Sequence, residues 1–596
     1  MQLASLDWAV IVVYIIITFI LGLWFTKRAG SSLEEYFVAG RSLPWWIAGT
    51  SIAATWFATD APLATAALVR QHGIFGNWLW WYETGGLIFL VFFVAKFWRR
   101  ANILTDAELI EIRYSGRSAS ILRLVSALYQ GVLRNLITMG WVMLAMAKFG
   151  EVLLGWRPME TMIICGTLAV IYTVASGLWG VVLTDMFQFV TGLFGSLVLA
   201  VIVVVKIGGI GAMVTAIQNL SDAPVGVLDI IPNPSHISPI EFVSYLCLFF
   251  VLWSRAGQSG YPAQRLFSTK DDKHAMYATL LWGILGIIVI TWPWVVVGMG
   301  SLVLLPISEA SPALAADPEL AYPMMLNMLM PVGMKGLLVA SFLAAFMSTM
   351  DTRLCWGGSY LVNDIYKRYL VKDASDKHYI MASRVAIVLL AIGTVVSAYF
   401  MESIQGAWIY IINLTAGLAV VWGMRWYWWR VNAWSEISAM VGSVVLANGG
   451  YILKGLLFLN LLPQDWFDSL YVIYTSDYKF IRATFILVAC TFIWVTVAYV
   501  TKPVDEKVLS EFYRRVRPGG MWGKYALQNP DIQTDMPMSK RWLGFILGVG
   551  FIDLLLIGIG YIMTGKYTIG LVLLPVVALC FWGVMRLMKQ QSAPES

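Results

Sequence analysis

Charged residues are scarce in this 596-residue sequence, and the shortage excludes a soluble globular protein. Only 13% of the residues are Asp, Glu, Lys or Arg, whereas 59% are hydrophobic and 28 are tryptophan. Soluble domains usually carry about 25% charged residues, which keep their surfaces in water. The composition therefore indicates a polytopic protein whose main partner is the lipid bilayer.

Histidine and cysteine are also rare, which argues against an enzyme with a metal or thiol centre. The four histidines fall in predicted loops without ligand spacing, and the five cysteines are scattered, mostly within apolar runs. Neither set predicts a metal cluster, a disulfide framework or a nucleophile-base pair. The net charge of +6 is explained by basic membrane loops, so we expect no nucleic-acid partner. No sequence feature indicates an obligatory protein partner.

Long apolar runs divide the chain into about fifteen candidate membrane spans. They lie at 8–26, 45–69, 79–98, 119–150, 158–177, 180–205, 240–257, 276–305, 333–363, 380–401, 406–429, 433–458, 480–500, 541–564 and 567–588. The first run lacks a basic flank before it and has Lys27 and Arg28 after it, which argues against a cleaved signal peptide. We expect an uncleaved helix with its N-terminus outside.

Lysine and arginine alternate between successive connections, which predicts the orientation of the chain. With the N-terminus outside, the odd-to-even connections are basic, and the even-to-odd connections are poor in Lys and Arg. Cytoplasmic loops carry this basic bias. We therefore expect a multi-pass protein of the plasma (cell inner) membrane with a cytoplasmic C-terminus.

Oxygen-bearing side chains form a polar face on the segment 333–363. At 100° per residue, Ser341, Ala345, Ser348 and Thr352 fall within about 60° of one another, and Thr349 and Asp351 flank them. The hydroxyl groups alone would not indicate a site, because Ser and Thr within a membrane helix often donate hydrogen bonds to the carbonyls of that same helix. A carboxylate at that depth is costly unless it meets an ion, a partner or a cavity, so this face is a candidate site.

Two other spans are predicted to be interrupted. In the second, Pro62 follows Asp60 and should free backbone carbonyls near Ala58. The seventh ends irregularly between Trp253 and Arg265. Broken helices at membrane depth usually line ion and substrate sites, and two of them five spans apart are typical of an inverted repeat.

Several stretches in order resemble the sodium:solute symporter family, which includes sodium-coupled glucose, proline and sialic acid carriers. They are 35–46, the Thr-Asp-x-x-Gln stretch within 172–188, Gln264-Arg265, Ala345 to Asp351 and 425–432, and together they cover about residues 5–435. Ala175-Ser176-Gly177 departs from the paired glycines that the family usually shows. The last two spans and the basic linker 501–540 lie outside the common core.

The resemblance implies an all-α, leucine-transporter-like fold with a five-plus-five inverted repeat, one extra N-terminal helix and about four C-terminal helices. The predicted organisation has an extra span and loop at 1–44, a core at 45–430 with repeats at 45–205 and 239–430, and further spans at 431–500. A basic cytoplasmic linker follows at 501–540, and two terminal spans with a tail at 541–596. The function implied is uptake of a small organic solute, driven by inward sodium flow through alternating access.

Family sites carry over to particular residues of this chain. The resemblance implies a main sodium site formed by Ala58, Ala61, Ala345, Ser348 and Thr349, with a break of the second span supplying carbonyls. A second sodium site or an exit path would involve Asp185, Ser348, Asp351 and Thr352.

Solute contacts are predicted from Asp60, Glu83, Arg255 and Gln258. Arg255 favours an anionic solute if its guanidinium faces the cavity, although it could instead pair with an acid or extend to the membrane surface. The sequence does not distinguish sugars, polyols, amino acids and carboxylates. Proton coupling in the same fold and a transporter-fold sensor stay as alternatives, and no filter-like repeat indicates a channel.

Overall fold

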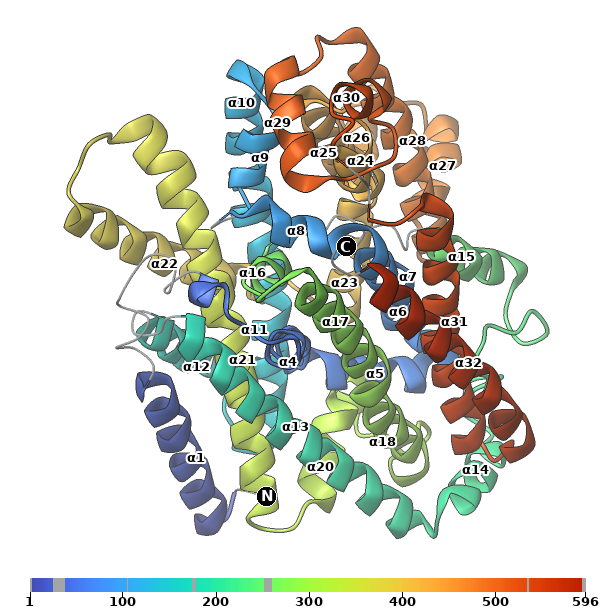
Figure 1. Ribbon diagram of the computed structural model, residues 1–596. Coiled ribbons are helices and arrows are strands. Elements are labelled where there is room, and N and C mark those ends of the chain that lie inside the picture. The colour runs from blue at the N-terminus through green and yellow to red at the C-terminus, as the bar shows by residue number, and fades with distance from the viewer. Residues whose placement is uncertain are drawn as a thin grey trace.

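The computed structural model is a bundle of helices, several of them bent or broken (Figure 1). It describes residues 3–24, 38–103, 106–173, 178–250, 260–532 and 535–591. Within these ranges the regular elements are helical, with two isolated bridges, Leu43 to Thr269 and Trp428 to Met521. The prediction of an all-α membrane protein is confirmed.

Apolar helices occur where the fifteen spans are predicted. In the described ranges, nine helices are long and apolar enough to cross a membrane, and three bent pairs bring this number to as many as twelve. Three shorter apolar helices, Ser5–Thr18, Pro158–Ile171 and Pro239–Phe249, match the other predicted runs. Since length alone does not show that these three cross the bilayer, fifteen crossings and the proposed domain boundaries stay predictions.

The helices that carry the residues of the site come from both halves of the chain. They are α4 (Trp45–Trp56), α5 (Asp60–His72), α6 (Trp78–Trp81), α7 (Glu83–Phe89), α11 (Asn135–Leu154), α13 (Leu178–Ile207), α16 (Tyr261–Phe267), α21 (Met334–Ser359) and α23 (Ile404–Ala416). Further helices of the bundle are α1 (Ser5–Trp24), α12 (Pro158–Thr173), α15 (Pro239–Phe250), α17 (Asp272–Gly283), α18 (Thr291–Leu304), α20 (Ala321–Leu329), α22 (Asp376–Tyr399), α25 (Ala433–Ala447), α28 (Lys479–Val500), α31 (Met538–Met563) and α32 (Tyr567–Gln591).

The predicted break in the second span is present between α4 and α5. The two helices meet at 58°, and Pro62 lies in the first turn of α5. Helix N-termini have no intrahelical acceptor for their first N–H groups, so a proline there costs no hydrogen bond. Thr59, in the break, donates to the Phe342 carbonyl of α21 at 3.2 Å, and the Phe57 ring stacks on Phe342 at 5.9 Å. The break is therefore held against the polar helix α21.

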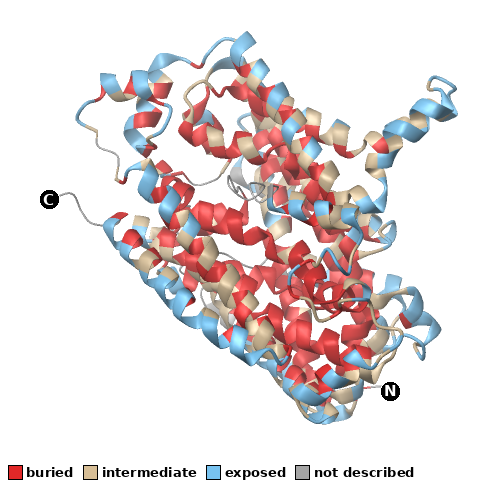
Figure 2. Cartoon of the chain, turned by 90° about the vertical axis from the view of Figure 1, so that its right-hand side faces the viewer, coloured by how far each residue is buried: buried red, intermediate tan, exposed pale blue. Residues whose placement is uncertain are grey.

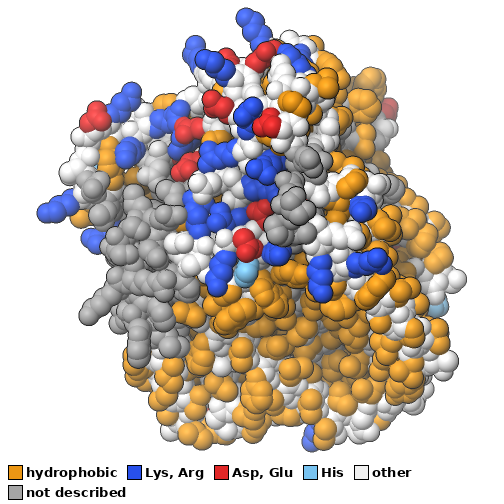
Figure 3. Space-filling view, viewed as in Figure 1, with side chains coloured by type: hydrophobic (Ala, Val, Ile, Leu, Met, Phe, Trp, Pro, Cys, Tyr) orange, Lys and Arg blue, Asp and Glu red, His pale blue; other side chains and the backbone are white. Residues whose placement is uncertain are grey.

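Exposed residues lie on the outer faces of the bundle, whereas its centre is buried (Figure 2). Many of the exposed residues are large and hydrophobic, for example in α1, α22, α28 and α32. Such faces are suited to lipid. Charged side chains gather instead at the end of the molecule that carries α29 (Glu506–Val516), α30 (Gly523–Gln528) and α10 (Gly116–Ser126) (Figure 3). The opposite end carries the start of α1 (Figure 1).

The segment predicted as a basic linker, 501–540, is folded onto the core. The Arg113 guanidinium lies 5.4 Å from the Phe512 ring of α29 and 5.2 Å from Trp522. Asp535 forms ion pairs with Lys96 and, at 2.9 Å, with Arg100. Burial alone would raise the pKa of Asp535, but the positive charges of Lys96 and Arg100 outweigh it and hold this pKa below its usual range. The segment is therefore a docked cap with its own helices.

Candidate functional site

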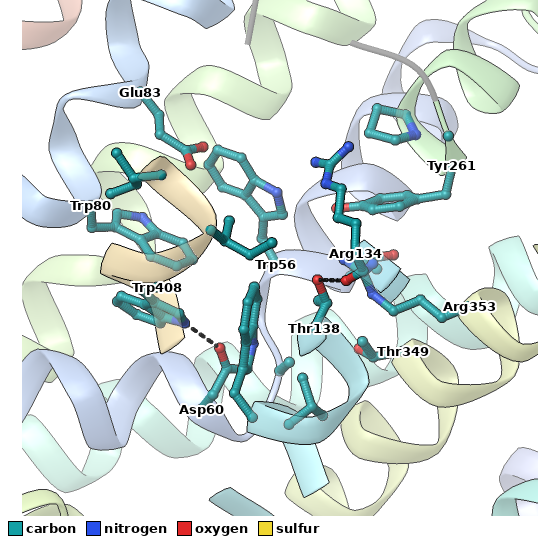
Figure 4. A pocket seen from close by; sticks show the side chains of 18 of the residues that line it. Trp56, Asp60, Trp80, Glu83, Arg134, Thr138, Tyr261, Thr349, Arg353 and Trp408 are labelled. Atoms are coloured by element: carbon teal, nitrogen blue, oxygen red, sulfur yellow. Dashed lines mark hydrogen bonds between the residues drawn. The ribbon is translucent and has the colours of Figure 1, made fainter. Parts of the chain in front are cut away.

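A cavity of about 110 Å³ lies where α4, α5, α7, α11, α16, α21 and α23 converge (Figure 4). Its wall combines four charged side chains with five tryptophans and two tyrosines. The residues that argue for its chemistry are Asp60, Glu83, Arg134, Arg353, Thr349, Trp56, Trp80, Trp141, Trp408 and Tyr261. Charged and hydroxyl groups set among aromatic side chains are typical of a small-molecule site.

Asp60 and Glu83, both predicted solute contacts, line this cavity. The Trp408 indole donates to the Asp60 carboxylate at 3.2 Å. Glu83 begins α7 and is only 7% exposed. The Trp80 ring, also in the cavity wall, packs on Trp408 with ring centroids 5.1 Å apart. The break before α5 and the start of α7 thus present two carboxylates to one space.

Two arginines, Arg134 and Arg353, lie on the side of the cavity opposite Glu83 and Trp80 (Figure 4). Arg134 ends a π-helical stretch, Ala127–Arg134, and donates to Gln130 Oε1 at 3.3 Å. The Arg353 guanidinium lies 5.6 Å from the Tyr261 ring, and the side chain of Asn135 donates to its main-chain carbonyl at 2.8 Å. With Asp60 and Glu83, the cavity wall has formal charges of both signs in equal number.

Thr349 is the predicted sodium ligand that faces the cavity, together with Ala58 at the break. The Thr349 hydroxyl donates its proton to the Ala345 carbonyl at 3.0 Å. Its lone pairs therefore remain available to a cation. Ala61 and Ala345 are also buried near this contact between the break and α21. The structure brings together the two elements that were predicted to share the ion.

Ser348 and Thr352 turn away from the cavity toward Asp185. The Asp185 carboxylate accepts hydrogen bonds from Ser348 and, at 2.7 Å, from Ser51. Arg265 lies 3.8 Å from the same carboxylate and 3.5 Å from the Thr352 hydroxyl. Both Asp185 and Arg265 are almost fully buried.

Asp351 contacts Cys355, whose Sγ lies 3.7 Å from its carboxylate, and it also interacts electrostatically with Arg265. The predicted second site thus contains a guanidinium. The other two predicted solute contacts, Arg255 and Gln258, lie outside the described residues, as does the second predicted break.

Sequence reasoning missed Arg134, Arg353 and the aromatic wall. Arginine inside a membrane span is a functional signal in itself, and both residues fall within predicted spans. The π-helical stretch that ends at Arg134 changes which side chains share a face, so a 100° helical wheel could not place it. The tryptophans look like any interfacial aromatic residue until the fold gathers them.

Comparison with known proteins agrees with the fold. The profile of the family described as "Sodium:solute symporter family" matches residues 36–445. The chain is 27% identical over 546 residues to sodium/glucose cotransporter 4 of Danio rerio, covering 85% of this chain and 80% of that protein. It is 25% identical over 488 residues to the sodium/glucose cotransporter of Vibrio parahaemolyticus, covering 77% and 86%.

A solved structure of a sodium-coupled sialic acid symporter shares the fold, with a TM-score of 0.63 at 20% identity, and covers 84% of this chain and 99% of that one. The resemblance predicted from the motifs is confirmed by the family match, which takes in the break, the cavity and α21. These relatives are transporters, not enzymes. The chain therefore belongs to the sodium:solute symporter family and carries out sodium-coupled uptake of a small solute.

Proposed function

We propose that this transporter takes up an organic solute with a carboxylate group, and that Arg134 and Arg353 bind that group. The observation that carries the proposal is the presence of two guanidinium groups in the cavity wall. Arginine forks onto carboxylates with two parallel hydrogen bonds, and this pairing is stronger where water is excluded. The anion contact that the sequence assigned to Arg255 is here assigned to two residues from α21 and the π-helical stretch.

Asp60 and Glu83 would bind the other end of the solute, through its hydroxyl or ammonium donors. Glu83 lies across the cavity from the arginines, and the rings of Trp56, Trp80 and Trp408 in the cavity wall offer flat apolar faces (Figure 4). A wall with opposite charges at its two sides orients a solute that has an acceptor end and a donor end. The relatives' sugars and sialic acid are hydroxyl-rich, which fits the donor end of this description.

Matched solutes that differ in one carboxylate test this assignment. We expect sodium-dependent thermal stabilisation by N-acetylneuraminate or D-glucuronate, and little by the methyl ester of the first or by D-glucose. Arg353→Gln should weaken the affinity for the carboxylate solute by about ten- to a hundredfold, since a charge-assisted hydrogen bond contributes about 1.5–3 kcal/mol. Arg353→Lys should retain part of it. If the methyl ester and D-glucose stabilise the protein as much as N-acetylneuraminate and D-glucuronate do, the carboxylate assignment is refuted.

The main sodium ion is proposed to bind at the contact between the α4–α5 break and α21. Its ligands would be the Ala58, Ala61 and Ala345 carbonyls with the Ser348 and Thr349 hydroxyls, since a hard cation prefers several neutral oxygens if it must also leave. The hydrogen bond from Thr59 to Phe342 supports this, because it holds the break beside Ala345. Sodium is a transported substrate in this proposal.

The Asp185 cluster is proposed as a closed exit path to the cytoplasm and not as a second sodium site. Arg265 already gives Asp185 a positive partner at 3.8 Å, and a sodium ion there would meet that fixed charge. We therefore expect one sodium ion per solute. A reversal-potential measurement in proteoliposomes checks the ratio, and a value of two would restore the two-site version with Asp185, Ser348, Asp351 and Thr352.

The basic end of the molecule is proposed to lie in the cytoplasm, in the cell's plasma or inner membrane. Charged side chains gather around α10, α29 and α30, as expected of a cytoplasmic face, and the first helix starts at the other end (Figures 1 and 3). Cysteine labelling from outside distinguishes the two orientations. Sites in the outer loop, such as Ser235→Cys, should react with an impermeant maleimide in intact cells, and sites in α29, such as Glu511→Cys, should not.

A further inference from the structure

Asp106 is a partly buried acid outside the cavity that accepts hydrogen bonds from two distant parts of the chain. It lies in the connection between α8 (Ala95–Ala101) and α9 (Glu108–Arg113), beyond the end of a candidate span. Its carboxylate oxygen Oδ2 accepts from the main-chain N–H of Gly260 at 2.7 Å and from the Tyr360 hydroxyl at 3.1 Å. The sodium and solute sites described above do not use it.

The first partner of Asp106 is part of the cavity wall. Gly260 and Tyr261 both line the cavity, and they are the N-cap and the first residue of α16. Gly260 has a φ of +87°, and a Cβ atom added there would lie 3.2 Å from the ring of Trp356, which also lines the cavity. The first N–H groups of a helix have no acceptor within it, so the Gly260 N–H needs one from elsewhere. Asp106 supplies that acceptor and is one hydrogen bond away from the cavity wall.

The second partner fixes Asp106 to the end of α21. Tyr360 directly follows the last residue of that helix. Its ring packs on Trp356 with centroids 5.3 Å apart, and a Cβ atom added at Gly131 would lie only 2.8 Å from its own Cβ. Ala107, next to Asp106, packs with Tyr360 in a small hydrophobic cluster. Because Tyr360 is packed closely by several elements, it is a firm support for the carboxylate.

The Tyr261 ring, which follows Gly260, contacts two guanidinium groups. It lies 5.6 Å from Arg353 in the cavity wall (Figure 4) and 5.6 Å from Arg265, the partner of Asp185. A cation within about 6 Å of an aromatic ring is attracted to its face. The position of the Tyr261 ring therefore affects where the Arg353 guanidinium meets a solute.

We propose that Asp106 is a positioning residue that holds the Tyr261 ring against Arg353 in the solute site. It does so by anchoring Gly260 to Tyr360, which joins the connection after α8 to the start of α16 and the end of α21. The inference rests on the proposed role of Arg353 in solute binding. It places a determinant of that role outside the cavity, in a connection between helices.

Hydrogen exchange tests the anchor without any solute. Mass spectrometry of overlapping peptides that span Gly260 reports the opening of its N–H hydrogen bond. Asp106→Leu should speed this exchange by about tenfold or more, because a bond to a charged acceptor is lost. Asp106→Asn, whose Oδ1 can still accept, should leave it within about twofold of normal. Unchanged exchange in Asp106→Leu would overturn the proposal, whatever solute the protein takes up.

Uptake kinetics test whether Asp106 acts through Tyr261. The probes are labelled N-acetylneuraminate and D-glucuronate in proteoliposomes. Tyr261→Leu and Asp106→Leu should each raise KM about five- to tenfold, as expected for loss of a desolvated cation–π contact. The double variant should be no worse than Tyr261→Leu, because both changes act on the same ring. A double variant whose KM rises by the product of the two effects would overturn the proposal, and so would Asp106→Asn as impaired as Asp106→Leu.

Asp364→Leu is the matched control for loss of an acid. Asp364 is buried in the π-helical stretch that begins at Tyr360, and it pairs with Arg123, which does not line the cavity. Arg123 keeps a second acid as a partner, so the control leaves no uncompensated charge. The change should alter neither exchange at Gly260 nor KM. Equal effects at positions 106 and 364 would overturn the proposal, because they would indicate a general loss of structure.

A conservative change at Tyr360 separates positioning from folding. Tyr360→Phe keeps the ring and removes only the hydroxyl that donates to Asp106, so it should speed exchange at Gly260 and raise KM by about two- to threefold each. Normal values of both would overturn the proposal even if Asp106→Leu fails to fold. If the unmutated protein accumulates neither probe, the carboxylate assignment fails, and the exchange data still decide whether Asp106 anchors α16.

Discussion

Replacing Thr349 by valine should raise the sodium concentration for half-maximal uptake by about ten- to a hundredfold while the protein still folds. The hydroxyl donates to Ala345 at 3.0 Å and lines the cavity, so its lone pairs are placed to bind the ion. Loss of one buried interaction with a charged group costs about 1.5–3 kcal/mol, which corresponds to that range. Uptake against sodium concentration in proteoliposomes, with choline as the replacement cation, gives the measurement.

A matched threonine controls for the loss of a buried hydroxyl. Thr394 in α22 is buried and donates back to the Leu390 carbonyl at 2.8 Å, away from the cavity. Thr394→Val should therefore leave the sodium dependence unchanged, and Thr349→Ser should restore it. Uptake by the unmutated protein that is as fast in choline as in sodium would contradict sodium coupling itself. If uptake by the unmutated protein requires sodium but Thr349→Val leaves the sodium dependence unchanged, Thr349 is not a sodium ligand.

The broken second span could be predicted because its cause is local. Proline and an acid in an apolar run are visible in the sequence, and the structure places Pro62 in the first turn of α5. Bends between α23 and α24 (Ala419–Tyr427) and between α25 and α26 (Gly449–Phe458) were not predicted. Neither of these pairs contains a proline, and Gly417 packs instead against Ser443 and Cys490 from other helices. The bend at Gly417 therefore depends on tertiary packing.

The polar face of α21 could be predicted from the sequence, but its neighbours could not, because they too depend on tertiary packing. The helical wheel grouped Ser348 with Thr352, and the structure indeed turns both toward the Asp185 and Arg265 pair. It is the flanking Thr349, one turn before Arg353, that faces the cavity. A sequence shows which residues share a face, but it does not show which neighbour that face meets. The break and α21, two elements that meet at the cavity, could be predicted from motifs, whereas the charges that line the cavity required the fold.

Removal of the Lys148 ammonium should have the largest effect on stability. Lys148 in α11 pairs with Glu319 at 2.5 Å and with Asp317 at 2.6 Å, and both Lys148 and Glu319 are buried. Glu319 also accepts from the main-chain N–H groups of Ile404 and Gln405 at 2.9 and 3.1 Å. One carboxylate thus ties α11 to the first turn of α23, the helix that carries Trp408 in the solute cavity.

Lys148→Met should lower the free energy of unfolding by about 3–5 kcal/mol, because it leaves a buried carboxylate without its cation. Adding Glu319→Gln should recover part of this loss, since the amide removes the uncompensated charge, and thermal unfolding in detergent measures both. Lys335→Met is the control: Lys335 is partly buried and bonds to the Asn327 carbonyl at 2.7 Å and to its side-chain oxygen, both neutral, so its loss should cost much less. Equal effects at positions 148 and 335, or a double variant less stable than Lys148→Met, would show that the cluster does not hold α11 to α23 through charge.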